Sequence, residues 1–274
     1  FTFFSSEYHS VLPGAFVMKK YDRHQYIQSS SPVEAELLSV FDSKDNLVIL
    51  DIGSCEGEDS IRYSRLFPHS VIYAFEPLPA NYERIREHIK KYECTNISIV
   101  TGALGGEVGE ADFYVSSGAP PEKENDENWD FGNKSSSLYK PDQALVETPW
   151  LKFDTCIKVP VNTLENFCKE NSVEKVDFIH LDVQGAELDV LRGAGRFLDT
   201  VSLVWMEVEA VALYKDQPLK SEVEEFMHER GFILIKNTVK RKAGDQLYLK
   251  SDLSDLLPAQ ASFLGRIKSR IWEK

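Results

Sequence analysis

The chain of 274 residues contains 42% hydrophobic and 27% charged residues, a composition typical of a soluble globular protein. This length allows one large α/β domain or two small ones, and we expect one domain with additions. The formal net charge of −13 at pH 7 argues against a polyanion as the main partner, so no nucleic-acid partner is expected.

The cysteines and the apolar runs favour a reduced, cytoplasmic setting. The four cysteines, Cys55, Cys94, Cys156 and Cys168, are widely separated and form neither a CxxC pair nor a Cys/His cluster. No run of apolar residues approaches the ~20 needed to cross a bilayer, so no transmembrane segment is expected. The opening stretch FTFFSSEYHS lacks the basic start and the apolar core of a secretory signal.

Residues 1–46 are mixed in character, and we expect them to form a cap over one end of a sheet. Apolar residues at helical spacing follow Ser31-Pro32, a pair that suits a helix start. The sequence therefore predicts a helix that begins near this proline.

The stretch from Leu47 to Pro77 has the pattern that opens a mononucleotide-binding unit. It reads as a strand at 47–52, a turn with Gly53 and Gly57, a helix at about 57–67, and a second strand at 71–75 that ends at Glu76. Glycine in such a turn leaves room for a ligand to approach the backbone. A carboxylate at the tip of the second strand can accept both hydroxyls of a ribose, and Glu76 is the candidate.

The next elements continue the alternation. An apolar face built from Tyr82, Ile85, Ile89 and Tyr92 predicts a helix, and a third strand is expected at 97–101. The turn that follows, Gly102-Ala103-Leu104, offers backbone groups and an apolar surface for an adenine ring. A further short strand is expected at 111–115.

The segment 116–148 breaks this pattern. It is polar, acidic and rich in proline, which predicts a long loop or lid. Such a loop can close over a substrate, and the alternative is an insertion without a role.

Order returns in the second half of the chain. The expected strands lie at 156–161, 176–182, 201–208, 232–236 and 246–250, and the expected helices lie at 164–170, after Asp182 and after Ser221. Glu224 stands three residues after Ser221, which predicts a capping box, and Gly231 is expected to end that helix.

The alternation of strands and helices predicts an α/β domain over 47–250. Its expected architecture is a Rossmann-like, mostly parallel sheet with helices on both faces and ligands beyond the carboxyl ends of the strands. Residues 251–274 form an amphipathic tail in which Phe263, Ile267 and Ile271 alternate with basic residues. Packing against the domain or a second subunit is preferred over binding to an anionic membrane or another partner.

Two cofactors use such a site, a dinucleotide and S-adenosylmethionine. A dinucleotide turn requires GxGxxG so that a pyrophosphate can lie on the helix N-terminus. Here the turn is Gly53-Ser-Cys-Glu-Gly57, and the Glu56 carboxylate would repel a pyrophosphate at close range. The same charge is tolerable near a sulfonium and an ammonium, so the sequence favours S-adenosylmethionine over a nicotinamide cofactor.

Six stretches in order then resemble a known family: ILDIGSCEGEDS, VIYAFEPLPANYERI, VTGALGG, VNTLENF, IHLDVQGAELDVLRGA and VWMEVE. Over residues 47–250 the chain resembles the FkbM-type methyltransferases, class I enzymes that use S-adenosylmethionine and mostly methylate hydroxyls. The resemblance implies the class I fold, a seven-stranded sheet with an antiparallel C-terminal strand. It also implies acceptors such as sugar or polyketide hydroxyls, in polysaccharide or secondary-metabolite biosynthesis, with a second copy or glycosyltransferase machinery as a partner.

The resemblance also implies residues that bind the cofactor, namely Gly53, Ser54, Gly57, Glu76, Pro77, Ala103 and Leu104. Asp51, Ser60, Gly102 and Asp182 are further candidates for cofactor binding. The chain departs from the family at Ser54-Cys55, where Ala-Asn is frequent, and at Gln184, where Glu is common. Any role that needs a carboxylate at 184 therefore falls to Asp182 or Glu187.

Methyl transfer to a hydroxyl requires a group that accepts the hydroxyl proton. His180 and Asp182 share one face of the fourth main strand, and Asp182 is nearer its tip. We expect Asp182 to be the base or to orient the acceptor, with His180 as second choice. The alternatives are a hydrogen-bonded core role for His180 and a helix-capping role for Asp182.

The acceptor is expected to contact Gln184, Glu207 and Glu209, the last two at the end of the neighbouring strand. These carboxylates could also hold a divalent metal with Asp182, but no clear further ligand accompanies them and no metal is expected. Three other functions stay open: a non-catalytic binding module, methylation of nitrogen or carboxyl groups, and, disfavoured by the turn, a nicotinamide-dependent oxidoreductase.

Overall fold

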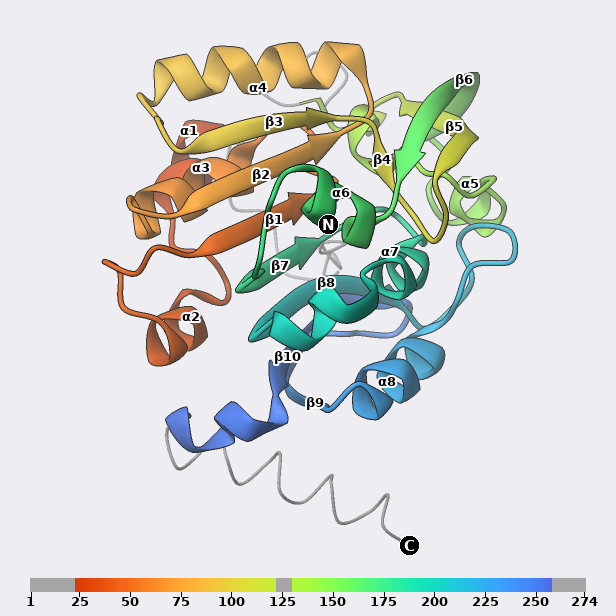
Figure 1. Ribbon diagram of the computed structural model, residues 1–274. Helices are drawn as coiled ribbons and strands as arrows, with labels where there is room; N and C mark the ends of the chain where they lie inside the picture. Colours follow the sequence, from red (N-terminus) through yellow and green to blue (C-terminus); the bar gives the residue numbers. More distant parts are fainter. Residues whose placement is uncertain (1–22, 122–129, 258–274) are drawn as a thin grey trace, which may run out of the picture.

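The computed structural model of the chain describes residues 23–121 and 130–257 (Figure 1). The apolar tail positions Phe263, Ile267 and Ile271 lie outside these residues, as do the first half of the expected cap and the middle of the expected loop. Within the described residues, no helix combines the length and the apolar character that crossing a bilayer requires.

A seven-stranded sheet forms the centre of the domain, as the sequence predicts. Its order is β3-β2-β1-β7-β8-β10-β9, and the pairs β1–β2, β2–β3, β1–β7 and β7–β8 are parallel. Strand β10 runs antiparallel to both of its neighbours. The strands are β1 Val48–Ile52, β2 Val71–Glu76, β3 Ile97–Thr101, β7 Phe178–Leu181, β8 Leu203–Glu209, β9 Phe232–Asn237 and β10 Ala243–Lys250.

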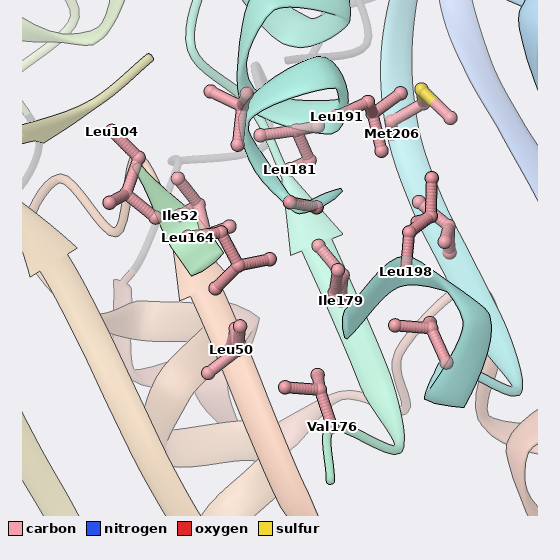
Figure 2. Close-up of a cluster of buried hydrophobic side chains, with 14 of the residues drawn as sticks. Leu50, Ile52, Leu104, Leu164, Val176, Ile179, Leu181, Leu191, Leu198 and Met206 are labelled. Carbon is pink, nitrogen blue, oxygen red and sulfur yellow. The ribbon is translucent and has the colours of Figure 1, made fainter. Parts of the chain in front are cut away.

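Helices cover both faces of this sheet because successive strand residues point to opposite sides. Figure 2 shows Leu50 and Ile179 on the face that packs against Leu164, Leu191 and Leu198. The elements on this face are α6 Leu164–Glu170, α7 Glu187–Gly193, the 3-10 helix η3 Gly195–Thr200 and α8 Lys220–Glu229.

The other face packs against the first helices of the chain. Ile49 and Phe178 contact a second apolar cluster that includes Leu37 of α2 Glu34–Val40 and Tyr63 of α3 Glu58–Leu66. In the described part of the expected cap, α2 therefore adds to the core on this face, and α1 Arg23–Gln28 packs beside α3. The helix near Ser31-Pro32 begins later than predicted, at Glu34.

A second sheet of three strands was not predicted. It consists of β4 Ala103–Leu104, β6 Lys152–Asn162 and β5 Gly109–Ser117, in the order β4-β6-β5. The two-residue β4 is too short to leave a periodic pattern, so the sequence indicated only a turn there. Its position matters because β4 directly follows β3 and brings the small sheet beside the tips of β2 and β3 (Figure 1).

One local prediction was wrong, and one segment has more regular structure than expected. The described parts of 116–148, predicted to be a long loop or lid, include the 3-10 helix η2 Gly132–Ser135 and α5 Gln143–Glu147. The capping box predicted at Ser221 is displaced, because α8 begins at Lys220 and the Glu222 carboxylate accepts a hydrogen bond from the Leu219 N–H at 2.9 Å. Ser221 therefore lies inside the first turn.

Candidate functional site

A pocket lies beyond the carboxyl ends of β1, β2 and β7, where the parallel-sheet rule places ligands. It encloses about 530 Å³ of empty space, part of it open to solvent. Eight of the predicted site residues line it together: Gly53, Glu76, Pro77, Gly102, Ala103, Leu104, Asp182 and Gln184. The predicted order of strands and turns therefore converges on one cavity.

One wall of the pocket is apolar. Leu78 and Leu104 are buried there, and Phe113 of β5 and Leu138 pack beside them. Phe113 lies in β5, and Leu138 lies in the segment between β5 and β6. The sequence analysis considered pocket residues only up to the turn after β3, so it missed both. A wall of this kind suits the flat face of an adenine ring.

Glu76 ends β2 and lies at the pocket wall, only 4% exposed. Burial raises the pKa of this carboxyl to about 8, although hydrogen bonds from the Leu78 N–H (2.7 Å), the Asn81 side chain and the Cys55 backbone oppose the shift. Near neutral pH the ligand-free protein therefore holds Glu76 largely in its protonated form.

The glycines of the first turn serve the packing of the chain itself. Gly53 has a φ of +85°, and a Cβ there would lie 1.8 Å from the Asp182 carbonyl oxygen. Gly57 has a φ of +81°, and a Cβ there would lie 3.1 Å from the Ile85 side chain. Gly53 also lines the pocket, so the expectation that glycines in this turn leave room for a ligand stays a prediction.

Glu56 is fully buried and is not among the residues that line the pocket. Its carboxylate forms ion pairs with Arg23 and with Arg84 (3.3 Å) and accepts a hydrogen bond from Asn133 Nδ2 at 3.1 Å. These cations neutralise it, so the predicted repulsion of a pyrophosphate by Glu56 does not hold. The charge of Glu56 therefore does not distinguish S-adenosylmethionine from a dinucleotide.

Asp51, Ser54, Ser60 and His180 form a buried network outside the pocket lining. Asp51 Oδ1 lies 2.9 Å from His180 Nδ1, and Ser60 Oγ donates to the other carboxylate oxygen. Ser54 Oγ donates to the Asp51 carbonyl at 2.6 Å. Burial lowers the pKa of His180, but the Asp51 hydrogen bond and charge outweigh it and raise the pKa to about 9. Asp51 therefore holds His180 outside the residues that line the pocket.

The Gln184 amide connects the two predicted acids at the acceptor side. Its Nε2 donates to Asp182 Oδ1 at 2.7 Å and to Glu207 Oε2 at 2.6 Å. Tyr214, which the sequence did not single out, donates to Gln184 Oε1 at 3.2 Å. Of these residues, Asp182 and Gln184 line the pocket.

Glu207 and Glu209 lie behind the pocket wall, each 2% exposed. Burial raises the pKa of both carboxyls well above the ordinary range, and the Asp182 charge adds to the shift. Among residues 23–121 and 130–257, no group of three or more histidine, cysteine or acidic side chains is arranged to hold a metal ion.

The lining residues fit the charges of S-adenosylmethionine. The pocket combines an apolar wall, a buried carboxylate that can accept hydroxyl groups, and a second carboxylate at Asp182, next to which a cationic group is favoured. The family described as Methyltransferase FkbM domain matches residues 51–234.

Individual relatives agree with this match. The chain is 34% identical over 194 residues to the 2-O-methyltransferase NoeI of Sinorhizobium fredii, which covers 70% of this chain and 76% of that protein. It is 26% identical over 150 residues to Methyltransferase 1 of Beauveria bassiana, or 54% of this chain and 59% of that protein.

A solved methyltransferase FkbM from Methylobacillus flagellatus aligns with a TM-score of 0.48 at 13% identity, over 83% of this chain and half of that one. The family match covers most of the domain that the sequence predicts, from β1 to β9. The chain therefore belongs to the FkbM methyltransferase family, and it is a methyltransferase that uses S-adenosylmethionine.

Proposed function

We propose that this enzyme transfers the methyl group of S-adenosylmethionine to a hydroxyl of a sugar, within a glycan or a glycosylated metabolite. The observation that carries this proposal is the position of Asp182, a carboxylate in the wall of the cofactor pocket with its orientation fixed by Gln184. The similarity to a 2-O-methyltransferase supports oxygen as the methylated atom.

When bound, S-adenosylmethionine supplies a methyl group that is already activated by the sulfonium. The chain must then align the acceptor oxygen and take up its proton. Asp182 would take up the hydroxyl proton of the acceptor, so that the oxygen can receive the methyl group that the bound cofactor would supply. Gln184 holds the carboxylate through Nε2 and also donates to Glu207, whose pKa burial raises.

We assign the cofactor contacts from the same wall. Glu76 binds the ribose hydroxyls, and the apolar side chains of Leu104 and Phe113 contact the adenine ring. The backbone of Gly102 and Ala103 offers hydrogen-bonding groups at the edge of the ring. Ser54, Gly57, Ser60 and Asp51 support this site from below and do not touch the ligand.

The Glu76 assignment predicts a specific pH dependence of binding. Ribose hydroxyls donate to the ionised carboxylate, so below pH of about 8 a proton leaves Glu76 when the cofactor binds. Affinity for S-adenosylhomocysteine is therefore expected to rise as the pH approaches about 8 and to level off above it. Glu76→Gln should lose this rise and bind more weakly by about 1–3 kcal/mol at the plateau.

Calorimetric titrations of both proteins across this pH range measure the effect. The amino group of the ligand titrates in the same range, but it does so equally with either protein, so Glu76→Gln supplies the baseline. Identical pH dependence in the two proteins would remove Glu76 from the ribose site.

Product analysis tests the proposed reaction. The enzyme is incubated with methyl-labelled S-adenosylmethionine and panels of oligosaccharides, nucleotide sugars, amines and carboxylic acids. We expect label in a sugar product that survives mild base, because a methyl ether is stable where a methyl ester hydrolyses. Label that appears only in base-labile esters or in methylated amines would contradict O-methylation of a hydroxyl.

A further inference from the structure

Lys134 places a buried positive charge in the wall of the cofactor pocket. It belongs to η2 of the segment expected to be a loop or lid, and its side chain is 4% exposed. Its Nζ lies 3.6 Å from Cys55 Sγ in the first turn and 3.5 Å from Glu58 Oε1 at the start of α3. The segment after β5 therefore returns to the turn that follows β1.

The lysine remains charged in this environment. Burial lowers its pKa, but the neighbouring Cys55, Glu58 and Glu56 outweigh burial and raise the pKa above its ordinary value. A buried ammonium of this kind is costly unless anionic groups surround it.

The buried carboxylates near Lys134 have further cationic partners. Arg23 and Arg84 contact Glu56, and Arg23 Nε also donates to Glu58 Oε1 at 3.1 Å. Glu58 keeps Arg23 as a partner when Lys134 turns towards an anionic ligand, so the exchange leaves no buried carboxylate unpaired.

S-adenosylmethionine carries a sulfonium, an ammonium and one carboxylate. The pocket wall offers a carboxylate at Asp182 for the cationic groups and an ammonium at Lys134 for the carboxylate, with the Glu76 carboxyl at the ribose. We propose that Lys134 binds the carboxylate of the methionyl group and that η2 thereby completes the cofactor site. This assignment depends on the cofactor alone and holds for any methyl acceptor.

Two ligands that differ only in the carboxylate test the proposal: S-adenosylmethionine and its decarboxylated analogue. In calorimetric titrations, Lys134→Met should weaken binding of S-adenosylmethionine by about 10- to 100-fold, the usual range for a lost charge-assisted hydrogen bond. Binding of the decarboxylated analogue should change less than about twofold, since no partner of Lys134 is present in it. Lys134→Arg should keep most of the preference for the carboxylate.

Arg84→Met is the matched control, because it removes a cation of the same cluster that lies outside the pocket wall and is 45% exposed. It should leave both affinities nearly unchanged. Equal weakening of both ligands by Lys134→Met would assign the lysine to holding the turn and overturn the proposal, as would no weakening of either. If Lys134→Met does not fold, the affinities of the native enzyme for the two ligands provide the test. Equal affinity for S-adenosylmethionine and its decarboxylated analogue would contradict the proposal.

Discussion

Asp182→Asn is expected to lower kcat by about 100-fold or more, the contribution of a general base to proton transfer. The amide keeps the size and shape of the carboxylate, and its oxygen can still accept the hydrogen bond from Gln184 Nε2. Affinity for S-adenosylhomocysteine, which has no sulfonium, should therefore change little. Single-turnover rates with saturating cofactor, together with calorimetric affinities, separate the chemical step from binding.

Asp177→Asn is the matched control for this variant. Asp177 lies just before the other end of β7, where its carboxylate accepts a hydrogen bond from the Val48 N–H at 2.9 Å. Loss of this charge should affect stability and leave kcat of the folded enzyme unchanged. An Asp182→Asn enzyme that turns over at the native rate would exclude Asp182 as the base.

Gly53→Ala is expected to destabilise the fold by roughly 2–5 kcal/mol. The left-handed conformation of Gly53 costs an L-residue about 1–2 kcal/mol, and the overlap of the new Cβ with the Asp182 carbonyl forces the ends of β1 and β7 apart. Since globular domains are stable by only about 5–15 kcal/mol, much of the stability is lost. Denaturant titration followed by circular dichroism measures the change.

Gly109→Ala is the corresponding control in a strand. A Cβ added there would meet no atom within 4 Å, and Gly109 is exposed at the start of β5. A change within about 0.5 kcal/mol is expected there. If Gly53→Ala were equally mild but abolished cofactor binding, the glycine would serve the ligand after all, as the sequence had indicated.

The large sheet was predictable because its signals are local. Apolar runs predicted the strands, and apolar faces such as that of Ile85 predicted the helices, in the correct order along the chain. The alternation of strands and helices then implied a parallel sheet. The acids that end β2 and follow β7, Glu76 and Asp182, were recognised by position alone. Period-two alternation also placed His180 on the same face as Asp182, but it could not show that Asp51 binds this histidine.

The remaining parts of the site depend on contacts between distant segments. Lys134 contacts Cys55 although the two residues are 79 positions apart in the sequence, and no periodic pattern predicts a contact between such distant residues. The same limit applies to the glycine turn, where the sequence could not show that Gly53 lies against the carbonyl of Asp182, just after β7. It also explains Glu56, since its partner Arg23 lies in a segment with no recognised motif.

A crystal structure of the enzyme with S-adenosylhomocysteine tests the central claim most directly. The claim is that the cofactor lies in the pocket between the ends of β1 and β2, with its ribose on Glu76. We predict both ribose hydroxyls within hydrogen-bonding distance of the Glu76 carboxylate and the adenine ring against Leu104 and Phe113. A ligand bound elsewhere, or a ribose directed away from Glu76, would contradict it.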